Sequence, residues 1–176
     1  NNSFFSDSLT TIIGSGIGKF LSLVSTLIVA KILESEMYGI QSFFKSTITT
    51  VGFLAIFGLQ LTITSYISKK TNKFETHQII SSSILFVLIA SLFFSIIYTY
   101  VVFQSFDEEI NNIILLFFLI FMGSTSLSLN LLFNGVLAGL GLFKHISFIN
   151  FISGLFLISF LPFIAFKYSL SGILIS

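Results

Sequence analysis

Long uncharged intervals alternate with short charged clusters along this chain. Residues 78–106, 110–143 and 146–166 contain no Asp, Glu, Lys or Arg. Each interval can hold a helix that crosses the hydrocarbon core of a bilayer, which takes about 20 residues. The apolar runs are continuous rather than alternating, which favours helices over the strands of a membrane barrel. The pattern therefore predicts a helical membrane protein.

The expected fold is all-α, a polytopic bundle of transmembrane helices. We predict spans at about 9–30, 40–67, 79–103, 112–137 and 146–166, joined by short connections, with a partial sixth span over 168–176. A helix as short as the last segment reaches only about 13 Å. The chain also begins without Met. We therefore expect residues 1–176 to form a single transmembrane domain, the N-terminal fragment of a larger transporter.

Composition supports a membrane protein and narrows its chemistry. The chain is 55% hydrophobic and 9% charged, whereas a soluble domain carries about 25% charged residues. It has no Cys, which excludes disulfides and thiolate metal sites. With a net charge of +1 and no basic block, we expect no nucleic-acid partner. No metal or other cofactor is expected.

Lysine placement predicts the orientation of the helices. One side of the predicted bundle carries Lys69, Lys70, Lys73 and Lys144, whereas the other carries Lys31 and Lys167. Cytoplasmic loops are enriched in basic residues. We therefore place the N-terminus in the cytoplasm.

Polar residues recur at helical spacing inside the predicted spans. In the first span they step by three and four residues, which places them on one helix face: Thr11, Ser15, Lys19, Ser22 and Thr26. The second span repeats the pattern with Ser42, Lys45, Thr49 and Gly52, and the fourth adds Ser126, Asn130 and Asn134. The residues that we expect to line an internal cavity are Lys19, Lys45, Ser15, Ser22, Thr49, Asn130 and Asn134.

Lys19 carries the functional part of this prediction. It lies near the middle of the first span, where an ammonium group is costly and usually faces a wet cavity or a partner. No predicted span has an acidic residue at its middle, so the lysines favour an anionic ligand such as a phosphate. A second interpretation stays open, because Ser and Thr in membrane helices also bond their own backbone or join neighbouring helices.

The first part of the chain resembles a known family. Residues 18–33 (GKFLSLVSTLIVAKIL), followed by Tyr38-Gly39, are similar to the opening of bacterial polysaccharide flippases, which export O-antigen and capsule repeat units. Residues 57–66 (FGLQLTITSY) resemble the segment that ends the second helix in that family. The chain departs from the family pattern at Lys31, where an Arg is usual, and at Glu34, where a Gly is usual.

The resemblance implies a fold and a function. The fold would have two six-helix lobes around a central cavity, and this chain would form most of the first lobe. The substrate would be an anionic, pyrophosphate-bearing lipid-linked oligosaccharide that crosses the bacterial cytoplasmic (inner) membrane for surface polysaccharide synthesis. The cavity lysines, Lys19 and Lys45 here, would meet the pyrophosphate. The partners would be the bilayer, this substrate and the C-terminal half of the same transporter.

Three other functions remain open. A cation-coupled multidrug exporter of the same superfamily would need acidic residues within its spans. A membrane enzyme of polysaccharide assembly, such as a polymerase or ligase, would need placed acid–base groups. The two histidines, His77 and His145, fall in predicted loops, so we expect no catalytic residue and no enzyme activity. A purely structural membrane subunit would use its polar residues for helix packing alone.

Overall fold

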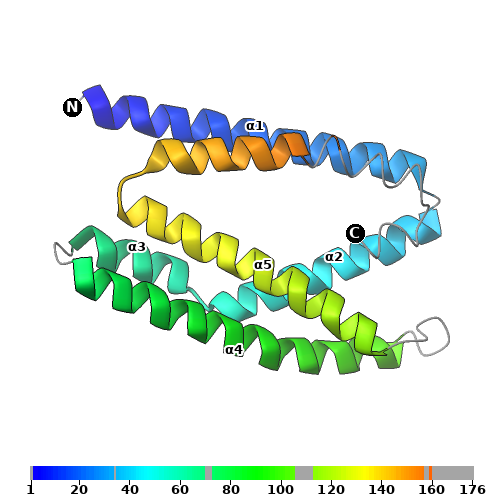
Figure 1. The fold of residues 1–176 in the computed structure, drawn as a ribbon. Coiled ribbons are helices and arrows are strands. Elements are labelled where there is room, and N and C mark those ends of the chain that lie inside the picture. Colours follow the sequence, from blue (N-terminus) through cyan, green and yellow to red (C-terminus); the bar gives the residue numbers. More distant parts are fainter. Residues whose placement is uncertain (1, 34, 70–72, 106–112, 157–158, 160–176) are drawn as a thin grey trace. The chain divides into compact units, whose positions relative to one another are not determined.

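The computed structural model describes residues 2–33, 35–69, 73–105, 113–156 and 159. These residues form five labelled helices: α1 (Asn2–Ile32), α2 (Ser35–Ile56), α3 (Leu59–Lys69), α4 (Lys73–Ser105) and α5 (Ile113–Gly139). A further helix covers residues 143–156 (Figure 1). No strand occurs in these ranges, so the expected all-α class is confirmed for them.

The chain divides into two compact units. Unit 1 comprises Asn1–Phe43 and Gly141–Ser176, and unit 2 comprises Phe44–Leu140. Unit 1 therefore holds α1 and the helix over 143–156, whereas unit 2 holds α3, α4, α5 and most of α2. The expectation of one transmembrane domain over the whole chain stays a prediction.

Two helices are long and apolar enough to cross a membrane, at Phe74–Gln104 and Ile113–Gly139. They contain the spans expected at 79–103 and 112–137, apart from residue 112, which lies outside the described residues. The segments Tyr38–Ile56 and Leu59–Lys69 pass the same test together as one bent span. The described residues thus support two spans, or three, rather than five. The predicted partial span over 168–176 lies outside the described residues. So does the part of the fifth span that follows residue 156, apart from residue 159.

The span expected over 40–67 is not one straight helix in the structure. The helix breaks at Phe57 and Gly58, and α3 continues at 42° to α2. Both residues have positive φ, 42° for Phe57 and 75° for Gly58. Gly adopts this conformation without a steric penalty, so Gly58 permits the turn. Its carbonyl accepts the first hydrogen bond of α3, from the Leu61 N–H at 3.2 Å.

Glycines on α5 and α2 set how closely the helices of unit 2 pack. A Cβ built on Gly123 would meet Ile48, one on Gly135 would meet Gln60, and one on Gly139 would meet Thr64 and Ile67. On α2, a Cβ on Gly52 would lie 2.6 Å from Leu127. The pairs Ile48–Gly123, Gly52–Leu127, Gln60–Gly135 and Thr64–Gly139 are each 75 positions apart. Therefore α2 and α3 run parallel to α5 and keep one register across the break.

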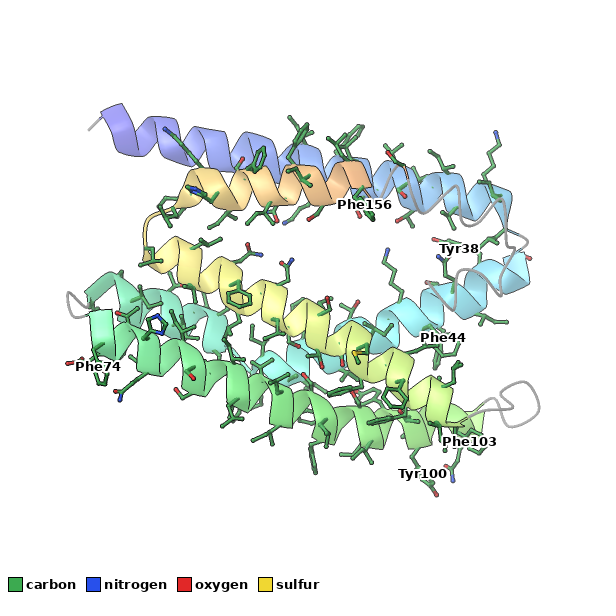
Figure 2. The ribbon with its side chains drawn as sticks, in the orientation of Figure 1. Tyr38, Phe44, Phe74, Tyr100, Phe103 and Phe156 are labelled. Atoms are coloured by element: carbon green, nitrogen blue, oxygen red, sulfur yellow. The ribbon has the colours of Figure 1, made fainter. Side chains whose placement is uncertain are left out.

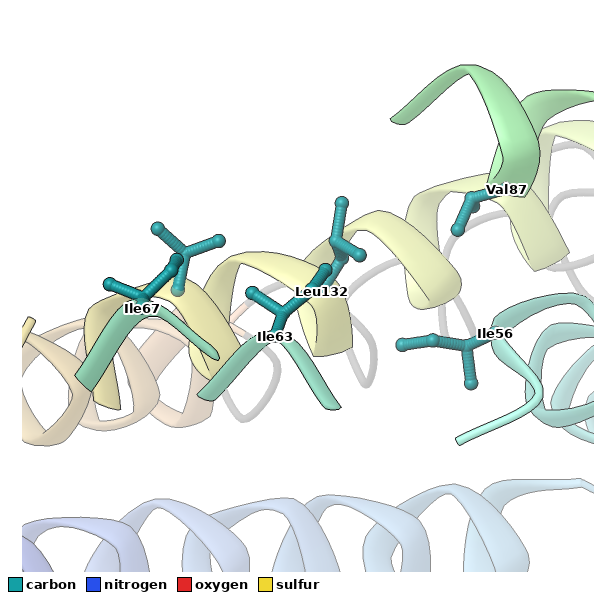
Figure 3. Close-up of a cluster of buried hydrophobic side chains, with 6 residues drawn as sticks. Ile56, Ile63, Ile67, Val87 and Leu132 are labelled. Carbon is teal, nitrogen blue, oxygen red and sulfur yellow. The ribbon is translucent and has the colours of Figure 1, made fainter. Parts of the chain in front are cut away.

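Helix α4 runs antiparallel to α5 and closes the apolar interior of unit 2 (Figure 1). One buried cluster joins α2, α3, α4 and α5 through Ile56, Ile63, Ile67, Val87, Leu132 and Val136 (Figure 3). A second cluster, nearer the start of α5, contains Val51, Val102, Leu116 and Ile120. On its outer side α4 exposes large apolar residues, and Figure 2 shows Phe74 and Tyr100 pointing outward. This apolar surface suits contact with lipid.

In unit 1, α1 packs against the helix over 143–156 at a glycine contact. A Cβ on Gly18 would collide with the backbone carbonyl of Asn150, and one on Gly154 would lie 2.9 Å from the Gly18 Cα. Such small residues allow membrane helices to approach each other closely. This contact lies one residue before Lys19, so it positions the segment that carries the predicted cavity lysine.

Candidate functional site

Four of the seven predicted cavity residues lie along one line of contact within unit 2. On α2, Lys45 and Thr49 alternate with Ile48 and Gly52, which contact α5. On α5, Asn130 and Asn134 follow Gly123 and Leu127, which contact α2, at steps of three and four residues. Residues at these spacings share one side of a helix. We call this surface the α2–α5 seam and define it by Lys45, Thr49, Asn130 and Asn134.

The α2 side of the seam carries a positive charge and a hydroxyl group. The Lys45 side chain is exposed and that of Thr49 is half-buried. The Thr49 hydroxyl donates to the Lys45 backbone carbonyl at 2.7 Å. The hydroxyl thus bonds to the backbone of its own helix, as the second interpretation of the polar residues expected for Thr in a membrane helix. The hydroxyl oxygen still has acceptor capacity.

The α5 side of the seam carries two linked amides. Asn134 donates through Nδ2 to Oδ1 of Asn130 at 2.8 Å, and Asn130 is exposed. This bond uses one donor and one acceptor, so the Asn130 amide nitrogen and the Asn134 carbonyl oxygen keep hydrogen-bonding capacity. The pair therefore presents a donor and an acceptor side by side at the surface of a candidate span.

The seam lies within the depth of the candidate spans. In the register of 75 positions, Lys45 is level with residue 120 of α5, seven residues after Ile113. At 1.5 Å per residue this is about 10 Å from the start of α5. The break at Phe57–Gly58 is level with residues 132–133, about 10 Å before the end of α5 at Gly139. Asn130 and Asn134 are level with residues 55 and 59, on either side of the break.

The break between α2 and α3 is level with the Asn pair of the seam in the register of 75 positions. The last four carbonyls of a helix have no partner within the helix. At the end of α2, the Phe57 N–H bonds to the Phe53 carbonyl at 3.2 Å, and α3 then starts its own ladder at Gly58. Phe57 is 76% exposed, so the break is not covered by packed side chains.

The other three predicted residues belong to α1 in unit 1. Lys19 is exposed, and within the described part of the chain its ammonium group has no hydrogen-bond or ion-pair partner. Ser22 is half-buried, and its backbone carbonyl accepts from the Thr26 hydroxyl at 3.0 Å. The side chain of Ser15 lies outside the described part. The structure therefore groups the seven residues into a set on α1 and the seam in unit 2.

Sequence reasoning missed a row of buried hydroxyl groups. On α4, Ser83, Ser91, Ser95 and Thr99 are buried, and on α5 so are Ser124, Thr125 and Ser128. The Ser128 hydroxyl donates to the Gly52 carbonyl at 2.9 Å, and Ser95 and Ser124 share a bond of 3.3 Å. The signal in the sequence was the four-residue repeat of Ser and Thr through both apolar runs, which is typical of packed membrane helices.

Neither a metal site nor a surface depression coincides with the seam in the part of the chain that the structure describes. Among the described residues, no group of His, Asp and Glu could hold a metal ion. A shallow depression on α4 is lined by Gln78, Ile79, Ser81, Ser82 and Leu85, and it includes none of the predicted cavity residues.

Comparison of the chain with protein-family models, curated proteins and solved structures found no match.

Proposed function

We propose that the chain is part of a flippase that moves a lipid-linked, pyrophosphate-bearing oligosaccharide across the bacterial inner membrane. The observation that carries this proposal is the α2–α5 seam, where a lysine, a hydroxyl and two amides lie along one surface of a membrane-spanning unit. The resemblance of residues 18–33 to polysaccharide flippases gives the class of cargo.

The charge of the seam selects an anionic cargo. Lys45 lies on it, and the sequence of residues 37–74 and of 110–143 contains no Asp or Glu. The seam is therefore positive and has no carboxylate to attract a cationic drug. A lysine at this depth acts as a point charge for phosphate. Lys19 on α1 of unit 1 is the other lysine that the resemblance assigns to the pyrophosphate.

The break in the α2–α3 segment supports a water-accessible surface. Backbone that leaves helical geometry at membrane depth is tolerated where it is buried in protein or lines a wet cavity. Phe57 and Gly58 are exposed, and in the proposed flippase they would line a wet cavity. The Asn pair beside the break can then exchange hydrogen bonds with sugar hydroxyls, which act both as donors and as acceptors.

The test is a charge reversal in a bacterial host that carries the complete gene. Lys45→Glu and Lys19→Glu should each abolish surface polysaccharide and leave lipid-linked repeat units in the inner leaflet, with the protein still in the membrane. Lys69→Glu is the matched control, because Lys69 is also exposed but ends α3 at the edge of the span. Normal surface polysaccharide in both the Lys45→Glu and Lys19→Glu strains would refute the proposal.

A further inference from the structure

The outer face of α4 changes from polar to apolar along its length. In the first turns of the helix, Gln78, Ser81 and Ser82 are exposed. From Leu85 to Val101, every exposed residue is apolar or Tyr. A polar side chain is exposed again at Gln104. The outer face therefore holds one apolar stretch with a polar residue at each end.

This apolar stretch matches the thickness of the hydrocarbon core of a bilayer. The 22 residues from Ser82 to Gln104 span about 33 Å of helix, and the core is about 30 Å thick. The Gln104 amide donates to the Tyr100 hydroxyl at 2.8 Å, and Tyr100 points outward (Figure 2). Tyr is enriched where a span meets the membrane–water interface. The two edges of the core therefore fall near Ser82 and Gln104.

Helix α5 agrees with these two edges. With Ser95 opposite Ser124 in an antiparallel pair, the edges are level with residues 137 and 115 of α5. Helix α5 covers Ile113–Gly139, so it ends two residues beyond each edge. Helix α4 is longer, because it begins nine residues before the first edge, about 13 Å outside the core. The start of α4 thus projects into the layer of lipid headgroups.

Helix α3 lies at the level of this projecting part of α4. The Thr64 backbone carbonyl lies 3.0 Å from the Cβ position of Gly139, the last residue of α5. The polar residues that α3 exposes are Thr62, Ser65, Ser68 and Lys69. Polar side chains of two helices are therefore exposed just outside the apolar stretch, where they can contact headgroups.

A shallow depression on α4 lies at the same edge. It is lined by Gln78, Ile79, Ser81, Ser82 and Leu85. The Ser82 hydroxyl donates to the Ile79 carbonyl at 3.0 Å. Within the part of the chain that the structure describes, the Gln78 amide and the Ser81 hydroxyl make no hydrogen bond. The depression thus presents two available donors beside an apolar surface.

We propose that this depression binds the headgroup of an anionic phospholipid. The Gln78 amide and the Ser81 hydroxyl donate to its phosphate oxygens. One acyl chain lies along Leu85 and Ile89, which follow Ser82 at steps of three and four residues on the same side of the helix. The lipid is a component of the bilayer, so this binding does not depend on which cargo the protein carries.

The charge at this end of unit 2 favours an anionic headgroup over a zwitterionic one. Lys69, Lys70 and Lys73 lie at the turn between α3 and α4, with Glu75 as the nearest acidic residue in the sequence. Basic clusters next to a span attract anionic lipids. Residues 107–109, beyond the other edge, are all acidic and repel them. The charge therefore selects the leaflet as well as the lipid.

Native mass spectrometry of the full chain in detergent measures this binding, with phosphatidylglycerol as the anionic probe and phosphatidylcholine as the zwitterionic one. Phosphatidylglycerol should bind at least fivefold more tightly. Joint Gln78→Ala and Ser81→Ala substitution should remove this preference. Ser65→Ala is the matched control, because Ser65 is exposed on α3 outside the depression, and it should keep the preference. Equal affinity for the two lipids, or the same loss in the double variant and the control, would overturn the proposal.

The depth of the depression is tested separately. The chain has no cysteine, so a spin label on a single introduced cysteine reports its own surroundings. In vesicles that contain phosphatidylglycerol, labels at Ser82→Cys and Gln104→Cys should collide mainly with a water-soluble nickel complex. Labels at Ile89→Cys and Phe93→Cys should collide mainly with oxygen, which concentrates in hydrocarbon. A label at Ser82→Cys that behaves like the one at Ile89→Cys would place the depression inside the core and refute headgroup binding there.

Discussion

The carbonyl oxygen of Gly18 occupies the space that a side chain on Gly154 would need: a Cβ built on Gly154 lies 2.7 Å from this oxygen. The contact joins two segments that are more than 130 residues apart in sequence. It makes a glycine necessary at both positions and sets the place of Lys19, the next residue on α1.

We expect Gly154→Ala to destabilise unit 1 by about 1–3 kcal/mol, because the added methyl group must push the two helix backbones apart. Gly16→Ala is the control on α1, since a Cβ at Gly16 would meet nothing within 4 Å. Without a contact to break, Gly16→Ala should gain up to about 1 kcal/mol from helix propensity. Unfolding titrations in detergent micelles would compare the two variants. Equal stability of both would contradict the backbone contact.

The hydroxyl of Ser128 joins α5 to α2, because it donates to the Gly52 carbonyl at 2.9 Å and also lies 2.7 Å from the Ser124 carbonyl. We expect Ser128→Ala to lower the free energy of unfolding by about 0.6–1.7 kcal/mol, the range for hydrogen bonds between membrane helices. Ser126→Ala, at an exposed position two residues away, should change it by less than about 0.5 kcal/mol. A larger effect at Ser126 than at Ser128 would show that this bond does not hold the helices.

The positive φ of 75° at Gly58 makes the break sensitive to any side chain. We expect Gly58→Ala to cost about 1–2 kcal/mol, the penalty of the left-handed conformation for an L-residue. Gly39 lies on α2 with nothing within 4 Å of its Cβ position, so Gly39→Ala should be neutral or stabilising. The same unfolding titration applies. A neutral Gly58→Ala would mean that α2 and α3 can join as one straight helix.

Water should reach the α2–α5 seam but not the outer surface of α4. In vesicles, a cysteine introduced by Thr49→Cys or Asn130→Cys should react with a charged, membrane-impermeant thiol reagent. A cysteine introduced by Ile89→Cys, on the apolar exposed surface of α4, should react at least tenfold more slowly. Thiolate formation needs water, and lipid provides none. Equal protection of all three cysteines would favour the interpretation that the seam only packs helices.

Hydrophobic pattern alone located most of the helices. The apolar intervals at 79–103 and 112–137 lie within α4 and α5 except for residue 112, which the structure does not describe. The helical class needed no tertiary information, because lipid leaves the backbone no other partner than its own helix. The step of four residues between Lys45 and Thr49, and between Asn130 and Asn134, also predicted which residues of one helix share a side.

Tertiary contacts decided what the period of a helix cannot show. Helical spacing tells which residues share a side, but it does not tell which helix covers that side. The contact of Gly52 with Leu127 placed Lys45 and Asn130 on one seam, and the pair Ser95–Ser124 set the register of α4. The break at Phe57 and Gly58 was also not foreseen, because a single glycine in an apolar run is compatible with a continuous helix. Composition and periodicity thus determined that the chain forms apolar helices with polar stripes. The close approach of backbones at glycines, which depends on residues far apart in sequence, decided which stripes meet.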